Sequence, residues 1–331
     1  MRIRSTYAII TSCLAAAAVV SSGCQDDETN DTTTSSTSTS TTSSSSSSGD
    51  GGSGGSSSSG TGGSGGSSSG TGGGGGSGGT GPDVCITNDT THLFINELGT
   101  GGGPAEFLEI RNAGAAAVDL TNYYLSDNSS YHGIAAGEEW DPPTGNPGSD
   151  FLIQFPSGAT IAAGALITIE FGSDFETAWG TCPDYTVRSG ITCNSNPVTQ
   201  MVAPTNGGFG TTPGNQLSNG GEMAMLFCWT PGYLVHDVDY LNWDSETDPN
   251  THVDKTSVTG YQPDTAAATQ QGVAATGPTN GNSIGRCDDT EDSETTTGGN
   301  GLLGHDETSE DWSASFELQA AVTPGAANNC N

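Results

Sequence analysis

The sequence is poor in basic residues. Among 331 residues it has six Lys or Arg against 38 Asp or Glu, and its formal net charge is −32 at pH 7. Such a chain is repelled by the phosphates of DNA and RNA, so we expect no nucleic-acid partner. Its only lysine, Lys255, lies far from the glycine cluster 99–103, which is followed by Pro104. A nucleotide-binding loop needs a lysine directly after its glycines, and this cluster does not fit one.

The sequence also lacks the common signals of catalytic and metal sites. None of the eight cysteines belongs to a Cys-x-x-Cys pair, which argues against a zinc or redox site. There is no His-Glu-x-x-His motif. We expect the five histidines at the surface, where they would be scattered: His92, His132, His236, His252 and His305.

Residues 1–23 have the features of a secretory signal peptide. Two arginines precede a short, mostly apolar run (7–20), and small residues follow it. The end of this segment, Ser21-Ser22-Gly23-Cys24, resembles the lipobox of bacterial lipoproteins, and that resemblance implies acylation of Cys24. Plain secretion after a cut near Ala18 is the alternative, and Cys24 would then be an ordinary thiol.

The segment that follows Cys24 is of low complexity. Residues 25–82 are almost entirely Ser, Thr and Gly, which offer no apolar surface to offset the entropy lost on ordering. We therefore expect a disordered linker, with a root-mean-square span of about 40 Å as a flexible coil. The chain thus divides into a signal peptide (1–23), a lipidated cysteine with its linker (24–82) and a folded domain (83–331).

The folded domain contains six cysteines: Cys85, Cys182, Cys193, Cys228, Cys287 and Cys330. An even number in an exported protein predicts disulfides, although six cysteines allow 15 pairings. We expect Cys182–Cys193, which closes a short loop. For the remaining four we favour Cys85–Cys330, which would join the ends of the domain, and Cys228–Cys287 by elimination.

The hydrophobic pattern of the domain is that of strands. No long window has the period of an amphipathic helix. Gly, Pro, Asn and Asp clusters separate short β-prone runs, and this arrangement predicts an all-β sandwich or barrel. The runs are Leu93–Ile95, Phe107–Ile110, Ala117–Leu120, Phe151–Ile153, Leu166–Ile169 and Met223–Phe227.

The order of several motifs resembles that of the lamin-tail domain family. They begin with Ile95-Asn96-Glu97, the EFLEIRN run at 106–112 and the VDLTNYYLSD run at 118–127. They continue with 161–169, 217–222, 238–240, 283–286, Trp312 and 323–328. This resemblance covers most of residues 83–331, and it implies an immunoglobulin-like β-sandwich without enzymatic activity. Glu97, Glu106 and Glu109 would then be structural, although paired carboxylates also serve glycoside hydrolases.

Two acidic loops are the weak candidates for a metal site. Calcium takes six to eight oxygen ligands, and carboxylates gather in the loops 244–254 and 288–294. The candidates are Asp244, Glu246, Asp248, Asp288, Asp289 and Asp292. We consider solvated acidic loops the better interpretation, and we therefore expect no cofactor other than a weakly bound calcium ion.

These features together predict a lipid-anchored bacterial lipoprotein at the outer membrane or cell surface. It would display a non-catalytic interaction module, and its partners would be the membrane, through the lipid, and an envelope protein or polysaccharide. A calcium-dependent adhesin is one alternative. An accessory module or cryptic extracellular hydrolase is the other.

Overall fold

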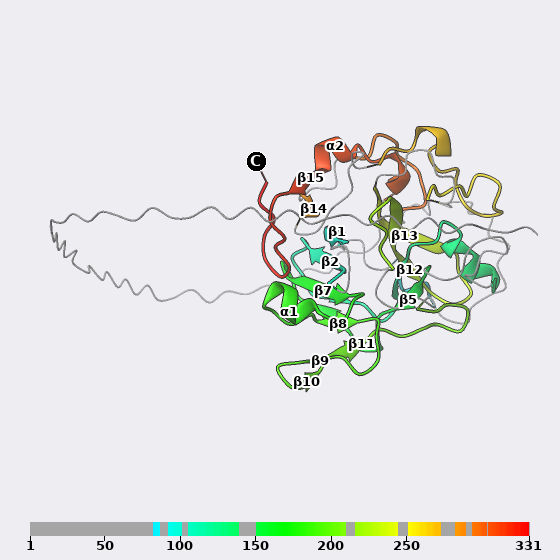
Figure 1. Ribbon diagram of the computed structural model, residues 1–331. Coiled ribbons are helices and arrows are strands. Elements are labelled where there is room, and N and C mark those ends of the chain that lie inside the picture. The colour runs from blue at the N-terminus through cyan, green and yellow to red at the C-terminus, as the bar shows by residue number, and fades with distance from the viewer. Residues whose placement is uncertain are drawn as a thin grey trace, which may run out of the picture. The chain divides into compact units, whose positions relative to one another are not determined.

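The computed structural model describes residues 82–86, 92–100, 105–138, 150–209, 216–243, 251–272, 282–288, 293–302 and 304–330. The predicted signal peptide, Cys24 and the linker as far as residue 81 lie outside these residues. Within them the secondary structure is mostly β-strand with a few short helices, so the predicted all-β class is confirmed (Figure 1).

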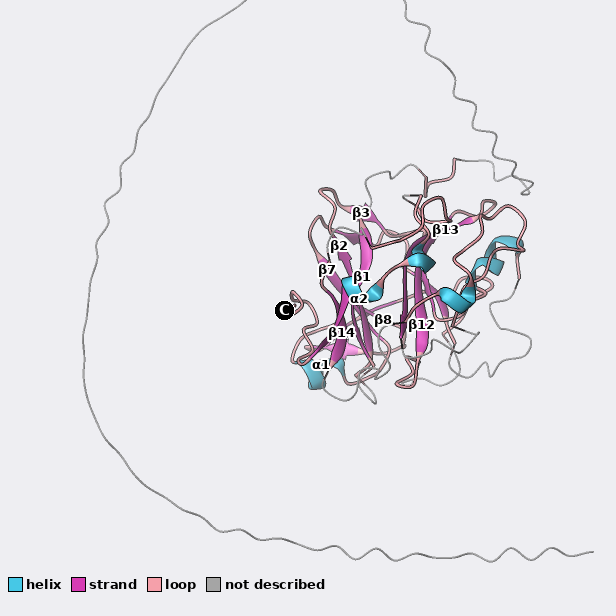
Figure 2. Ribbon diagram, turned by 90° about the horizontal axis from the view of Figure 1, so that it is seen from above, coloured by secondary structure: helices cyan, strands magenta, loops and turns pink. Residues whose placement is uncertain are grey.

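The strands form two large sheets. A seven-stranded sheet has the order β11-β8-β7-β2-β1-β14-β15, and a four-stranded sheet has the order β13-β12-β4-β5. The two sheets stand as separate layers in Figure 2, and β1 contacts β13 across them. The first sheet consists of β1 (Leu93–Gly99), β2 (Phe107–Asn112), β7 (Leu166–Glu170), β8 (Tyr185–Thr186), β11 (Thr199–Gln200), β14 (Ser283–Arg286) and β15 (Phe316–Gln319). The second consists of β4 (Tyr123–Ser126), β5 (Leu152–Gln154), β12 (Glu222–Trp229) and β13 (Val235–Trp243).

The remaining elements are small. Two further pairs are β3 (Val118–Asp119) with β6 (Thr160–Ile161), and β9 (Thr192–Cys193) with β10 (Asn196–Pro197). The helical segments are α1 (Phe175–Trp179), α2 (Trp312–Ser315), η1 (Tyr131–Ala136), η2 (Ala267–Thr269) and η3 (Glu307–Ser309). Within the described residues, no helix is both long and apolar enough to cross a membrane.

A β-bulge in β1 sets which of its side chains face the core. Ile95 lies opposite Ile110, and Glu97 lies opposite Glu109, so Asn96 is the extra residue. Alternate residues of a strand point to opposite faces, and the extra residue resets this alternation. Ile95 and Ile110 therefore join the core between the sheets, whereas Glu97 and Glu109 point to the outer face of the seven-stranded sheet.

The disulfides are Cys182–Cys193, Cys85–Cys228 and Cys287–Cys330, with Cα–Cα distances of 5.6, 5.8 and 5.6 Å. The first confirms the prediction. The predicted pairs Cys85–Cys330 and Cys228–Cys287 are wrong, because the two ends of the domain belong to different sheets. Cys85 lies against β12 of the four-stranded sheet, and Cys330 lies beside the end of β14 in the other sheet.

Candidate functional site

Three carboxylates meet at one end of the four-stranded sheet. Asp127 directly follows β4, Asp150 comes two residues before β5, and Glu222 is the first residue of β12. These strands are antiparallel neighbours, with Ser126 opposite both Leu152 and Met225. The start of one strand therefore lies beside the end of the next, and one oxygen from each of the three carboxylates lies within 4.8 Å of the others. We call this group the acidic triad.

An N–H group holds one oxygen of each carboxylate in the triad. The backbone N–H of Phe151 donates to Asp127 Oδ1 at 2.6 Å, and that of Ser218 donates to Glu222 Oε2 at 2.7 Å. The side-chain amide of Asn128 donates to Asp150 Oδ2 at 3.0 Å. The surrounding loops thus fix the orientation of all three acids.

Asp127 is the most deeply placed member of the triad. The residue is 4% exposed, and its Oδ2 has no hydrogen-bond partner although it is buried. Burial, followed by the charges of Glu222 and Asp150, raises the pKa of Asp127 well above its usual value. Burial also raises the pKa of Glu222 to about 8, and the charges of Asp150 and Glu106 add to this rise. Among the described residues, no basic group contributes to either shift.

Some of the other buried acids in the described part of the chain have a basic partner. Two buried cations neutralise four of those acids. Lys255 lies 2.7 Å from Asp237 and 3.1 Å from Asp264, and Arg286 lies 2.7 Å from Asp239 and 2.8 Å from Glu310. In the triad, two ionised carboxylates whose oxygens lie 4.8 Å apart, the upper limit here, repel each other by about 3.5 kcal/mol at an effective dielectric constant of 20. All three carboxylates can therefore be ionised together only if a cation binds among them or if the folded state loses stability by the energy of this repulsion.

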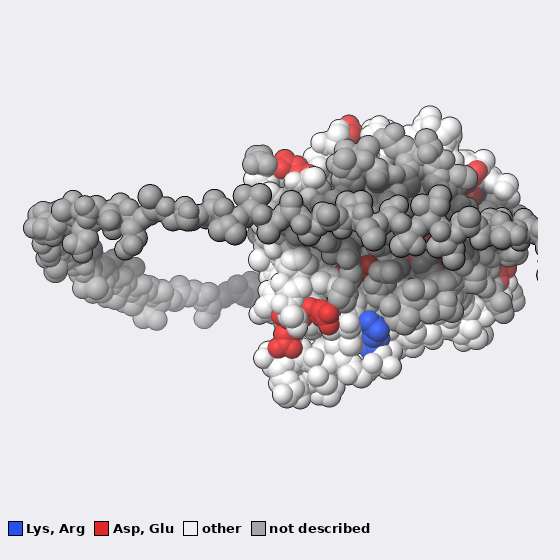
Figure 3. All heavy atoms as spheres, in the orientation of Figure 1, with Lys and Arg blue, Asp and Glu red and all other residues white. Residues whose placement is uncertain are grey.

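Much of the acidity of the domain is buried. Among the residues that the structure describes, twelve acids are buried: Asp83, Glu97, Glu106, Glu109, Asp127, Glu170, Asp237, Asp239, Asp264, Asp306, Glu307 and Glu310. On the face drawn in Figure 3, the described surface carries only a few separate acidic groups. The high negative charge is thus in part a property of the interior.

The glutamates of the lamin-tail-like motifs are held by the backbone. The N–H groups of Thr323 and Gly325, near the C-terminus, donate to Glu97 and Glu109. Burial raises the pKa of Glu109 to about 8, whereas the hydrogen bond from the N–H of Gly325 lowers it. Glu106 Oε2 accepts hydrogen bonds from two backbone N–H groups, those of 216 and 217. All three glutamates therefore have structural partners.

The loops first considered for calcium lie mostly outside the described residues. This applies to Asp244, Glu246, Asp248, Asp289 and Asp292. Asp288 is described, and it accepts a hydrogen bond of 3.3 Å from Ser293 Oγ.

The prediction that the histidines are at the surface is wrong for one of the five. His252 is 7% exposed, and His132 is half-buried. Burial lowers the pKa of His132 to about 4.

Comparison with known proteins gives little further guidance. No family model matches this chain, and no curated protein matches it in sequence. In fold, the chain is similar to a DUF4876 family protein from Bacteroides thetaiotaomicron VPI-5482. The two share 14% identity at a TM-score of 0.41, over 73% of this chain and 75% of the other.

The sequence analysis missed the acidic triad as a site. Asp127 and Glu222 each stand at the end of a stretch quoted for the family resemblance, and Asp150 precedes an apolar run. The sequence feature that marks the triad is one acidic residue at one end of each of three strands. Only the pairing of β4 with β5 and β12 brings these boundaries together, and the register of that pairing could not be derived from the sequence.

Proposed function

We propose that the protein is a bacterial lipoprotein that displays a non-catalytic, lamin-tail-like β-sandwich at the cell envelope. Acylation of Cys24 would anchor it, and the linker 25–82 would let the domain reach outward. The sequence of these two parts supports the anchor and the linker. The folded domain supplies a further argument at the point where the linker joins it.

At the point where the linker joins the folded domain, Cys85 forms a disulfide with Cys228. Cys85 lies at the start of the domain, and Cys228 lies in β12, which is paired on both sides by β4 and β13. A force applied to the linker is therefore transmitted through a covalent bond to an inner strand of the four-stranded sheet. This attachment suits a domain held at the end of a tether, and it is the observation that carries the proposal.

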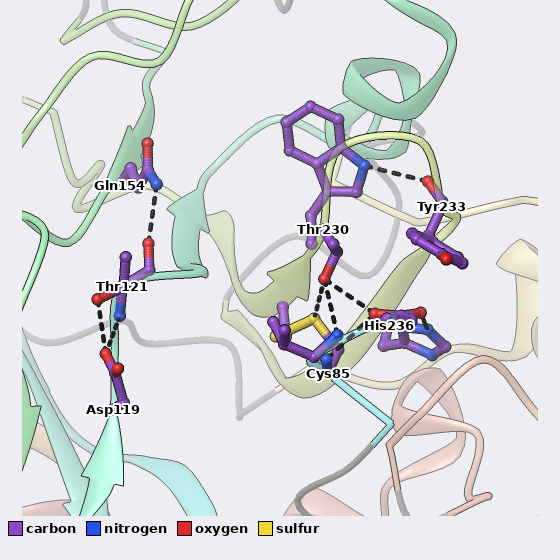
Figure 4. Close-up of a disulfide and its surroundings, with 11 residues drawn as sticks. Cys85, Asp119, Thr121, Gln154, Thr230, Tyr233 and His236 are labelled. Atoms are coloured by element: carbon purple, nitrogen blue, oxygen red, sulfur yellow. Dashed lines mark hydrogen bonds and ion pairs between the residues drawn. A yellow bond between two sulfur atoms is a disulfide. The ribbon is translucent and has the colours of Figure 1, made fainter. Parts of the chain in front are cut away.

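Hydrogen bonds reinforce the same attachment (Figure 4). Asp83 accepts from Thr230 Oγ1 at 2.9 Å and from the N–H of Cys85 at 3.1 Å. The second oxygen of Asp83 lies 2.9 Å from Nε2 of His236 in β13. Asp83 and Cys85 together bind the incoming chain to two neighbouring strands.

The partners of the glutamates support a role without catalysis. A general acid or base must reach its substrate, whereas Glu97, Glu106 and Glu109 are at most 1% exposed and accept hydrogen bonds from the backbone. An interaction with an envelope protein or polysaccharide fits this role. A calcium-dependent adhesin is the second candidate, and the acidic triad is the observation in its favour.

Metabolic labelling tests the anchor. In a bacterial host fed labelled palmitate, the wild-type protein is expected to incorporate label and the Cys24→Ala variant is expected to incorporate none. A Cys182→Ala variant is the matched control, because it removes a cysteine from the folded domain, and it should be labelled like the wild type. Equal labelling of the Cys24→Ala variant and the wild type would refute the anchor.

A further inference from the structure

The acidic triad has the carboxylate composition of a cation site. Asp127, Asp150 and Glu222 come from three different segments, and their facing oxygens lie within 4.8 Å of one another. Elsewhere in the described interior, Lys255 and Arg286 pair with four buried acids. Here N–H donors hold one oxygen of each acid.

The buried oxygen of Asp127 is an independent sign of a missing partner. Asp127 is 4% exposed, and its Oδ2 has no hydrogen bond. Buried carboxylate oxygens are normally paired with a donor or a metal. An ion placed among the three acids would supply that partner.

We propose that the acidic triad is a calcium site, with Asp127, Asp150 and Glu222 each giving at least one oxygen ligand. Two oxygens bound to one calcium ion at 2.3–2.6 Å can be at most about 5 Å apart, and the triad meets this limit. Water would supply the remaining ligands of the six to eight that calcium takes. The donors Phe151 N, Ser218 N and Asn128 Nδ2 orient the ligands, as outer groups do in metal sites.

A calcium ion at this place would fasten three strands together. It would connect the end of β4 with the starts of β5 and β12, and β12 is also the strand that carries Cys228. Sites of extracellular proteins commonly bind calcium with a Kd of about 0.1–1 mM, which suits an exported protein. This inference does not depend on acylation of Cys24, and its failure would leave the lipoprotein proposal intact.

The test measures the effect of cations on thermal unfolding and heat of binding. The full chain is purified in detergent, freed of metal with a chelator, and melted with CaCl2, with MgCl2 and without added metal. Tryptophan fluorescence reports unfolding, because Trp243 and Trp312 are buried. Isothermal titration with CaCl2 gives the affinity.

The variants are Asp127→Asn and Glu222→Gln, which keep the shape of each side chain and an oxygen for its N–H donor. Asp254→Asn is the matched control, because Asp254 is exposed and lies in the acidic loop 244–254, outside the triad. A variant with Asp244→Asn, Glu246→Gln and Asp248→Asn tests that loop directly.

We expect 1 mM calcium to raise the Tm of the wild type and of Asp254→Asn by about 1–6 °C. Magnesium should raise it less. In Asp127→Asn and Glu222→Gln, the calcium affinity should fall at least about tenfold, while the Tm without metal should be no lower than that of the wild type. A Tm without metal that is no lower than that of the wild type shows that both variants fold. We expect this result because each substitution removes one charge from three mutually repelling carboxylates.

Three results would overturn the calcium site. One is a wild type that neither melts higher in calcium nor releases heat on titration. Another is an undiminished calcium response in both triad variants, or its loss only in the 244–248 variant. The third is an equal response to magnesium, which would overturn the choice of calcium.

Discussion

Replacement of Glu109 by Gln should remove a measurable part of the pH dependence of stability between pH 5 and pH 8. Glu109 lies on the outer face of the seven-stranded sheet and is fully buried. The side-chain amide of Asn96 donates to Oε1 at 2.6 Å, and the N–H of Gly325 donates to Oε2. Burial raises the pKa of Glu109 to about 8, and the charges of Glu97 and Asp184 add to this rise.

The sign of the effect follows from the raised pKa. An unfolded glutamate titrates near pH 4.5, so between that pH and about 8 the folded chain retains a proton that the unfolded chain has lost. Stability therefore falls as pH rises through this window. With one pKa unit equal to about 1.4 kcal/mol, the contribution of Glu109 to the free energy of unfolding falls by about 3 kcal/mol from pH 5 to pH 8.

Urea unfolding at pH 5, 6, 7 and 8 measures this difference. Glu109→Gln keeps an oxygen for the N–H of Gly325, and Asn96 can turn its amide to accept from the new N–H2 group. The free energy of unfolding of the variant should fall by about 3 kcal/mol less than that of the wild type from pH 5 to pH 8. Glu176→Gln is the control, because Glu176 is exposed, and its curve should run parallel to that of the wild type. Parallel curves for Glu109→Gln and the wild type would refute the reasoning.

Two other predictions concern the covalent and ionic links of the domain. Replacing both Cys85 and Cys228 by Ser opens a link between residues 143 apart in sequence, and we expect a loss of about 5 kcal/mol in the free energy of unfolding. The same change at Cys182 and Cys193, 11 residues apart, should cost about 3 kcal/mol; urea unfolding of the two double variants that gave the reverse order would contradict this ranking. Lys255→Met leaves two buried carboxylates without their cation, and the expected cost is about 3–5 kcal/mol. A melting temperature equal to that of the wild type would show that the Lys255 ion pairs do not stabilise the fold.

The sequence predicted six of the strands, because short-range patterns determine them, whereas β13 was not among the predicted runs. Each of the six apolar runs contains or overlaps a strand of the structure, from Leu93 in β1 to Phe227 in β12. The loop closed by Cys182 and Cys193 was equally predictable, since 11 residues separate the two cysteines. Both features depend on residues that are close in the chain.

Features that depend on distant residues were not predictable. The partner of Cys85 is decided by the sheet to which the start of the domain attaches, and nothing near Cys85 in sequence specifies that sheet. The acidic triad likewise exists only because β4 lies between β5 and β12. Lys255 shows a third case. The residues around it in sequence do not indicate its partners, and the structure buries it beside Asp237 and Asp264.

Membrane fractionation tests the central claim, that the domain is held to a membrane through Cys24. Cells expressing the protein are broken, and the membranes are sedimented and washed with high salt, then with detergent. The wild-type protein should sediment, resist salt and be released by detergent, because a lipid anchor is held by apolar burial. The Cys24→Ala variant should remain in the soluble fraction. Release of the wild type by salt, or sedimentation of the variant to the same extent, would contradict the claim.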